Sequence, residues 1–188
     1  MSSDIASRRF DASKFSMIYA GAQKNIGQAG VTLVIVKESM LERIPEGLLT
    51  MLSYKTHVEN DSIYNTPPVF GMYVMGLVFK WIKKIGGLQR LEAINDEKAK
   101  LLYDYLDSSN GYYRPTAEMD SRSKMNITFR LPNEELEAKV VAEAKSKQLI
   151  GLKGHRSVGG MRASTYNAVS KESVVALIDF LEDFRNNN

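Results

Sequence analysis

Two short apolar runs in the first part of the chain have the length and flanks of β-strands. Residues 15–20 form the first, and residues 31–36, which are β-branched at five of six positions, form the second. Such runs predict strands buried on both faces of a sheet. The glycine-rich segment between them holds Lys24 in a turn at the strand end. A lysine there is usually solvated, but one held in a partly dry pocket could form an imine with a carbonyl.

Helical periodicity dominates the middle of the chain. Residues 37–43 predict a short helical turn, and residues 48–63 show no sustained period and predict irregular structure. Residues 69–85 are apolar almost all round, which predicts a helix enclosed on most sides and ended by Gly86 and Gly87. An amphipathic helix follows over residues 88–105, with an apolar stripe broken at Lys98.

A turn-rich stretch at residues 108–111 predicts a domain boundary. Beyond it, alternating apolar positions in residues 125–131 predict a half-buried strand, and residues 149–153 and 161–164 predict two short strands. Two amphipathic helices are expected, over residues 134–148 and after a cap at Ser170. We therefore expect a first domain over residues 1–107 and a small α+β domain over residues 108–188.

Composition narrows the classes of function. The net charge is +3 over 188 residues, and no run of basic residues suggests a nucleic-acid-binding module. Cysteine is absent and only two histidines occur, so a protein metal site is not expected. No stretch has the length of a membrane span or the pattern of a secretory signal. We expect a cytoplasmic protein that binds neither nucleic acid nor membrane.

Two polar clusters could bind anions. Asn65 and Thr66 precede two prolines that can start a helix, and a helix N-terminus favours anions, although plain helix capping explains the same pattern. Arg156 and Arg162, with His155, lie among glycines that allow a ligand to approach closely. Arginine binds carboxylates and phosphates in a bidentate manner, but exposed arginines at strand ends are the simpler interpretation.

Four stretches together resemble the phosphoserine aminotransferase family. Residues 19–30 (YAGAQKNIGQAG) resemble its cofactor-lysine segment, and three further stretches agree with the family in order and spacing: residues 64–68 (YNTPP), 122–126 (RSKMN) and 153–163 (KGHRSVGGMRA). The resemblance implies an α/β fold, namely the C-terminal part of the fold-type I pyridoxal-phosphate-dependent architecture. It comprises a remnant of the large-domain sheet and the small α+β domain.

The resemblance also implies roles for the polar residues. Lys24 would form the Schiff base with pyridoxal 5'-phosphate, and Gln23 would help to hold the cofactor phosphate. Asn65 and Thr66 would reach the phosphate bound by the other subunit of a homodimer. Arg162 would bind the substrate α-carboxylate, while His155 and Arg156 would meet the distal phosphate. The small-molecule substrates implied are phosphoserine, glutamate or 2-oxoglutarate, and 3-phosphohydroxypyruvate, in serine biosynthesis.

The resemblance covers only the C-terminal half of that family. The aspartate that pairs with the pyridinium nitrogen and the glycine-rich phosphate cup lie in the other half, so the chain alone is expected to have little turnover. The alternative hypothesis is a non-catalytic, truncated fragment that acts only as a dimerisation or structural module. In either case we expect exposed apolar faces and an open sheet edge near residues 17 and 31.

Overall fold

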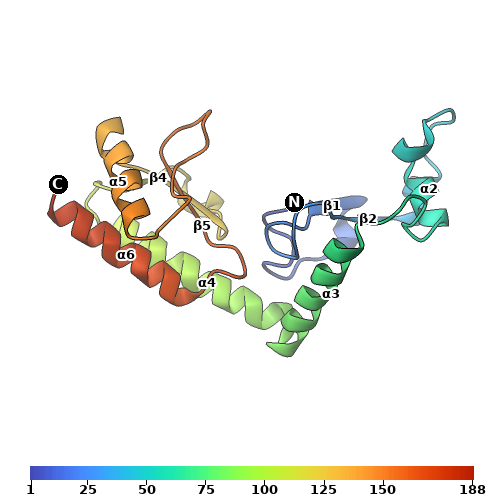
Figure 1. The fold of residues 1–188 in the computed structure, drawn as a ribbon, viewed down its shortest axis with the longest axis horizontal. Coiled ribbons are helices and arrows are strands. Elements are labelled where there is room, and N and C mark those ends of the chain that lie inside the picture. Colours follow the sequence, from blue (N-terminus) through green and yellow to red (C-terminus); the bar gives the residue numbers. More distant parts are fainter. The chain divides into compact units, whose positions relative to one another are not determined.

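The computed structural model describes residues 1–188 and divides them into two compact units (Figure 1). Unit 1 is Met1–Ile85 and unit 2 is Gly86–Asn188. The division therefore falls before the long amphipathic helix, whereas the turn signals had suggested a boundary after residue 107. Turn residues mark where an element ends, but packing decides to which unit a helix belongs, and this helix packs within unit 2.

Unit 1 contains a two-stranded antiparallel sheet of β1 (Met17–Gly21) and β2 (Thr32–Val36). Ile18 and Ala20 are buried, but Tyr19 on the opposite face is 62% exposed and Ile35 is 44% exposed. Both strands lie where the apolar runs predicted them. The prediction that residues 31–36 are buried on both faces is wrong for this chain, whereas the expected exposed apolar face is confirmed.

Short helices and one long helix complete unit 1. The elements are η1 (Ala12–Lys14), α1 (Glu38–Leu41), η2 (Thr50–Leu52), α2 (Tyr54–Glu59) and α3 (Val69–Lys84). The helical turn expected after β2 is confirmed as α1. Residues 48–63, expected to be irregular, instead contain η2 and α2, because six residues are too few to show a helical period.

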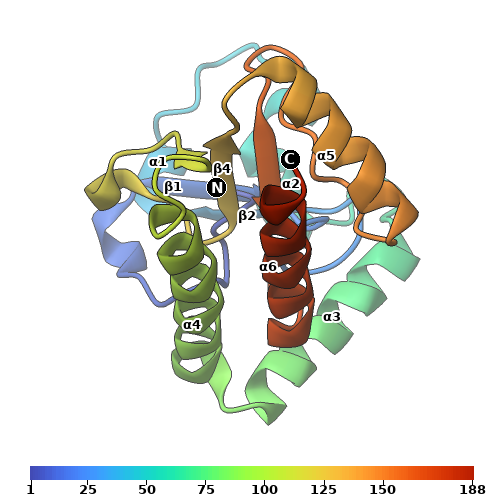
Figure 2. The ribbon, with the colours of Figure 1, turned by 90° about the vertical axis from the view of Figure 1, so that its left-hand side faces the viewer.

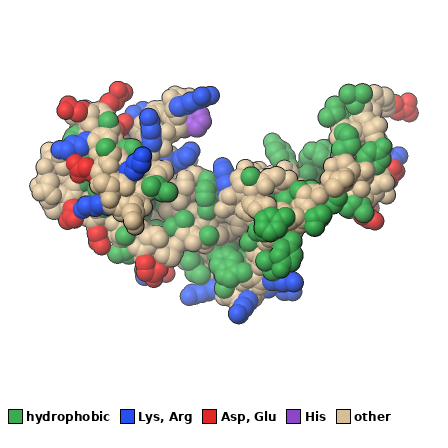
Figure 3. Space-filling model, in the orientation of Figure 1, with side chains coloured by type: hydrophobic (Ala, Val, Ile, Leu, Met, Phe, Trp, Pro, Cys, Tyr) green, Lys and Arg blue, Asp and Glu red, His purple; other side chains and the backbone are tan.

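The long helix α3 starts and ends as predicted but is far more exposed than its composition suggested. Only Gly71 and Ile82 are buried, while Val69, Phe70 and Tyr73 are each more than 60% exposed. Figure 3 shows hydrophobic side chains gathered over the part of unit 1 that contains α2 and α3. The predicted enclosure is therefore absent in this chain, because apolar periodicity reports where a helix could be covered and not what covers it.

Unit 2 has a three-stranded antiparallel sheet with the order β3-β4-β5. Its elements are α4 (Gly87–Asp107), β3 (Arg114–Pro115), η3 (Met119–Ser121), β4 (Asn126–Arg130), α5 (Glu134–Ser146), β5 (Met161–Ser164) and α6 (Lys171–Asn186). Helices α4 and α6 run side by side (Figure 2). Residues 149–153, predicted as a strand, make only a single bridge between Lys153 and Met161.

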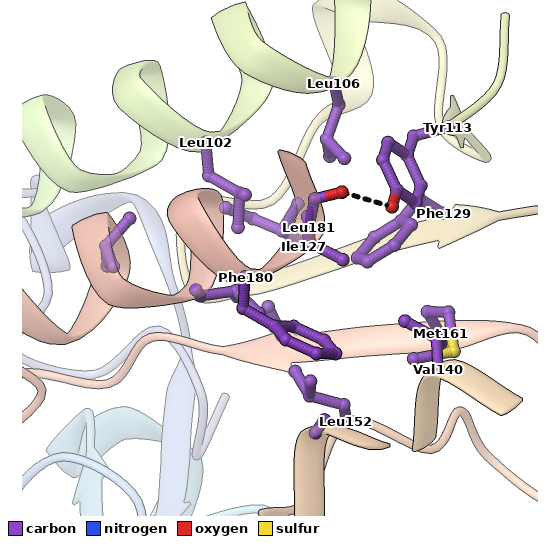
Figure 4. Packing of buried hydrophobic residues seen from close by; sticks show 14 of the residues in the cluster. Leu102, Leu106, Tyr113, Ile127, Phe129, Val140, Leu152, Met161, Phe180 and Leu181 are labelled. Atoms are coloured by element: carbon purple, nitrogen blue, oxygen red, sulfur yellow. Dashed lines mark hydrogen bonds between the residues drawn. The ribbon is translucent and has the colours of Figure 1, made fainter. Parts of the chain in front are cut away.

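The core of unit 2 lies between one face of this sheet and the three helices. Alternation in β4 places Ile127 and Phe129 in the core, both fully buried, as predicted. The Tyr113 ring packs edge-on against Phe129 with centroids 5.8 Å apart, and its hydroxyl donates to the Leu181 carbonyl at 2.8 Å (Figure 4). The apolar faces predicted for α5 and α6 contribute Val140, Ala144, Val174, Leu177, Leu181 and Phe184.

Lys98, the residue that breaks the apolar stripe of α4, is fully buried. Its ammonium donates to the carbonyls of Thr165 and Tyr166, each at 3.1 Å, and of Val169 at 2.9 Å. Burial lowers the pKa of Lys98 to about 8. The lysine therefore joins α4 to the segment between β5 and α6. Its aliphatic stem continues the apolar stripe of α4.

Side-chain caps define where α5 and α6 begin, and the cap of α5 gives a measurable prediction. Asn133 Oδ1 accepts from the Leu136 backbone N–H at 2.9 Å, while Ser170 caps α6 in the predicted manner. Replacing Asn133 by alanine should lower the free energy of unfolding by about 1 kcal/mol, because this N–H loses its acceptor. Urea unfolding of the Asn133→Ala and Asn133→Asp variants would measure the change. Equal losses in both would contradict a capping role, since aspartate can accept the same bond.

Candidate functional site

Lys24 lies in a short turn that begins where β1 ends. Hydrogen bonds fix this turn on both sides: the Ala22 N–H donates to the Val31 carbonyl at 2.9 Å, and the Ile26 N–H donates to the Ala22 carbonyl at 3.1 Å. The buried Asn25 side chain donates to the Ser3 carbonyl at 2.9 Å. The backbone that carries Lys24 is therefore held in place, while the lysine side chain itself is exposed.

Gln23 is exposed beside Lys24, and its amide folds back over Gly21. A Cβ at Gly21 would lie 2.5 Å from Gln23 Oε1, so a larger residue at position 21 would displace this amide. The glycine thus leaves room for an amide group next to the lysine. Together the two exposed side chains provide an amine and a neutral hydrogen-bonding group at one strand end.

Helix α3 supports the same turn through two close glycine contacts. A Cβ at Gly71 would lie 2.7 Å from Val31 Cγ2, so the helix backbone approaches the start of the β2 segment directly. A Cβ at Gly27 would lie 3.4 Å from that of Met75 on α3. Small residues at both points allow the turn and the helix to pack tightly.

Asn65 and Thr66 lie on the exposed segment that leads into α3. The N-cap of α3 is Pro68, which provides no side-chain cap, and the Asn65 amide donates only to the Thr66 carbonyl at 3.2 Å. The simple capping interpretation is therefore wrong for both residues. Their side chains remain available at a helix N-terminus, a position that favours anions.

In unit 2, His155 and Arg156 lie on the loop of residues 154–160, and both side chains are exposed. The Ser157 N–H donates to His155 Nδ1 at 3.3 Å, and the Ser157 hydroxyl lies 2.7 Å from the same atom. A backbone N–H can only donate, so Nδ1 accepts and the proton of the neutral imidazole resides on Nε2. Nε2 is then the atom that can donate to a ligand.

Gly154 closes this loop. Its N–H donates to the Gly160 carbonyl at 2.7 Å, and a Cβ at position 154 would lie 2.1 Å from the Gly159 carbonyl oxygen. The N–H groups of Val158 and Gly159 both donate to the His155 carbonyl, at 2.9 and 2.7 Å. The loop is therefore a compact turn whose geometry requires glycine at position 154.

Arg162 lies on β5, opposite Thr128 of β4, on the sheet face that points away from the core. Its backbone N–H donates to the Leu152 carbonyl at 2.8 Å. Arg162 Nε is buried without a hydrogen-bond partner. An unsatisfied buried donor on a guanidinium is costly, and an anion such as a carboxylate would satisfy it.

The predicted residues are divided between the two units of the structure. Gln23, Lys24, Asn65 and Thr66 lie in unit 1, whereas His155, Arg156 and Arg162 lie in unit 2. Sequence reasoning missed Ser157, which orients the His155 ring, although its place two residues after a histidine was a usable signal. The structure contains no group of three or more side chains suited to holding a metal ion. None of its helices combines the length and hydrophobicity needed to cross a bilayer.

Comparison with known protein families shows one family model that matches most of the chain. The family model described as aminotransferase class-V matches residues 1–177. This chain belongs to the class-V aminotransferase family. The resemblance to phosphoserine aminotransferases is also confirmed, because curated members with that name align over nearly the whole chain. The enzyme of Desulfotalea psychrophila is 57% identical over 188 residues, and that of Geobacillus kaustophilus is 56% identical over 185 residues.

Solved structures of the same kind match the α/β fold of this class-V aminotransferase chain. Phosphoserine aminotransferase from Bacillus circulans subsp. alkalophilus superposes with a TM-score of 0.97 at 54% identity, covering 100% of this chain and 52% of the other. A pyridoxal-phosphate-bound enzyme from Trichomonas vaginalis superposes with a TM-score of 0.91 at 40% identity, covering 97% of this chain and 52% of the other. The chain spans about half the length of the curated relatives it matches, 52% and 51% of the first two.

Proposed function

We propose that this chain forms part of a pyridoxal-phosphate-dependent phosphoserine aminotransferase that acts in the cytoplasm in serine biosynthesis. The enzyme would transfer an amino group from phosphoserine to 2-oxoglutarate, which yields 3-phosphohydroxypyruvate and glutamate, or catalyse the reverse reaction. The observation that carries the proposal is Lys24, an exposed amine on a backbone turn fixed by hydrogen bonds at the end of β1.

The residues present in unit 1 fit the cofactor. Lys24 supplies an amine that can bond covalently to an aldehyde, and the Gln23 amide beside it can donate to a phosphate. Asn65 and Thr66 are exposed before α3, where a helix N-terminus favours an anion. Bound pyridoxal phosphate would supply an electron sink for the carbanion left when the substrate Cα loses a proton.

The resemblance implies the other roles, and the chemistry of each side chain supports them. The Lys24 amine can accept the substrate Cα proton and return it. The buried Nε of Arg162 suits the substrate α-carboxylate. His155, donating from Nε2, and the exposed Arg156 suit the distal phosphate. We propose a homodimer in which Asn65, Thr66, His155 and Arg156 serve the active site of the neighbouring subunit.

Covalent trapping tests the role of Lys24. Pyridoxal phosphate is added to the purified 188-residue chain, the mixture is reduced with borohydride, and the adduct is located by peptide mass mapping. We expect a predominant adduct on Lys24 that disappears in Lys24→Ala. Lys37→Ala, which removes an exposed lysine just after β2, is the matched control and should keep the Lys24 adduct.

Two outcomes would count against the proposal. Labelling spread evenly over surface lysines would show that the Lys24 turn does not recognise the cofactor. Activity is tested in a chimera that joins the N-terminal half of the Desulfotalea psychrophila relative to this chain. A chimera that binds the cofactor on Lys24 yet forms no glutamate from phosphoserine and 2-oxoglutarate would refute the proposed substrate.

A further inference from the structure

Arg130, the last residue of β4, contacts the loop that carries His155 and Arg156. Its Nη2 donates a hydrogen bond to the Val158 carbonyl. This carbonyl belongs to the compact turn in which the N–H groups of Val158 and Gly159 donate to the His155 carbonyl. Arg130 therefore ties the middle of the loop to the sheet, at a distance of two or three residues from the proposed phosphate-binding side chains.

Glu137 on α5 fixes the other side of the same guanidinium. Arg130 Nη1 lies 3.2 Å from Glu137 Oε2, and the carboxylate side chain is only 12% exposed. Glu137 Oε1 also accepts from the Leu131 N–H at 3.4 Å. The planar guanidinium thus has one nitrogen on the loop and the other on a carboxylate that is itself held in place.

The glycines of the loop let the guanidinium approach the backbone. Gly159 and Gly160 have φ angles of +74° and +68°. A Cβ at Gly159 would lie 3.1 Å from Arg130 Nη1, and a Cβ at Gly160 would lie 2.9 Å from Arg130 Cδ. The two glycines allow a tight turn, and they also make room for the Arg130 side chain.

We propose that Arg130 is a positioning residue for the anion-binding loop of residues 154–160, acting together with Glu137. The inference rests on the proposed function, in which His155 and Arg156 meet the distal phosphate of the substrate. The charge of Arg130 is neutralised by Glu137, and its Nη atoms are directed to Val158 and Glu137, so it is not itself the phosphate ligand. Arg156 is exposed on the same loop, which leaves it as the cation that binds.

Arg130 positions the loop through the planar fork of its guanidinium, and not through its charge or the packing of its aliphatic stem. A lysine at position 130 would keep the positive charge and most of the aliphatic stem over Gly160. It could not donate to the Val158 carbonyl and to Glu137 with the same planar geometry. Arg130→Lys therefore separates positioning by the guanidinium from a merely structural contribution of the stem.

The test uses NMR on the whole 188-residue chain, with inorganic phosphate as the probe. Amide hydrogen exchange is measured at Gly154, Val158 and Gly159, and the ring signals of His155 are followed during a phosphate titration. Arg114→Lys is the matched control, because Arg114 lies opposite Arg130 on β3 but donates to the Leu131 carbonyl. The Ile127 amide in the core reports whether each variant remains folded.

We expect Arg130→Lys to speed exchange of the three loop amides about tenfold and to weaken phosphate binding several-fold, with the Ile127 amide unchanged. Arg114→Lys should change neither quantity. Loop exchange in Arg130→Lys equal to that in Arg114→Lys would overturn the positioning role. If phosphate leaves the His155 signals of the unmodified chain unmoved, the proposed phosphate site fails, while the exchange data still decide the role of Arg130.

Discussion

Replacing Lys98 by methionine should lower the free energy of unfolding by about 3 kcal/mol. Methionine keeps the length of the stem but leaves the buried carbonyls of Thr165, Tyr166 and Val169 without their donor. Each lost bond to a charged donor costs about 1.5–3 kcal/mol. Relief from burying the ammonium offsets part of that cost, since the lowered pKa of Lys98 shows that burial disfavours the charge.

Urea unfolding monitored by circular dichroism gives this value, and Lys100→Met on the same helix is the control. Lys100 pairs with Asp104 at the surface, and its side chain is 75% exposed. Its replacement should therefore change the free energy of unfolding by less than about 0.5 kcal/mol. Equal losses in the two variants would mean that the three hydrogen bonds of Lys98 contribute nothing net.

The same residue makes the stability of the fold depend on pH. The pKa of Lys98 is about 8 in the folded chain and 10.5 when unperturbed, so between these values the unfolded state binds more protons. The destabilising contribution of the buried charge is complete below pH 8 and is relieved as the pH rises toward 10.5. Between pH 8 and 10 the unmodified chain should gain about 1 kcal/mol per pH unit relative to Lys98→Met.

Near pH 10 tyrosines act in the opposite direction, equally in the unmodified chain and in Lys98→Met, so the difference between the two stabilities still reports Lys98. Burial raises the pKa of Tyr103, Tyr105 and Tyr113 above the ordinary value of 10.0. Above pH 10 their deprotonation in the unfolded chain lowers the stability of the fold. Stabilities of the unmodified chain and of Lys98→Met that run parallel between pH 8 and 10 would contradict the assignment to Lys98.

Gly154→Ala should be the most damaging single-methyl change in the loop of residues 154–160. The new Cβ would lie 2.1 Å from the Gly159 carbonyl oxygen and 2.6 Å from that of Gly160, both of them backbone atoms. The loop must open to accommodate it and would lose the bond from the Gly154 N–H to the Gly160 carbonyl. We expect a loss of about 2–3 kcal/mol in the free energy of unfolding.

Gly151→Ala is the matched control for this change. Gly151 precedes the loop and has a positive φ of +81°, but a Cβ there would meet nothing within 4 Å. The control therefore pays only the conformational cost of a left-handed alanine, about 1 kcal/mol. Chemical denaturation measures the loss in the free energy of unfolding for each variant. Phosphate titration of the His155 signals measures the effect of each variant on the loop. A Gly154→Ala variant as stable as Gly151→Ala would show that the loop is not closed as described.

Sequence patterns located the elements of unit 2 well because local and tertiary preferences agree there. The alternation of residues 125–131 became β4, and the apolar face predicted after Ser170 is the buried face of α6. Lys98 shows the limit of such reasoning. A lysine on an apolar stripe reads as an interruption in the sequence. Its three acceptors lie about 70 residues away, at separations of 67, 68 and 71.

For unit 1 the sequence patterns predicted where the strands and the long helix lie, but not how exposed their side chains are. Residues 31–36 and 69–85 have the composition of enclosed elements, yet Ile35 and Phe70 are exposed. For the candidate site, the motif around Lys24 and the glycines near His155 were visible in the sequence. The partnership of Arg130 and Glu137 was not, because an arginine at a strand end and a glutamate in a first helical turn are ordinary surface residues.

The uneven distribution of buried side chains between the two units has a calorimetric consequence. The main hydrophobic cluster lies entirely in unit 2, between Ala99 and Phe184, whereas unit 1 leaves much of its apolar surface in contact with water. Heat capacity rises on unfolding in proportion to the apolar surface that becomes newly hydrated. In the isolated chain, most of that increment therefore belongs to unit 2, and the curvature of the stability profile with temperature is largely a property of its core.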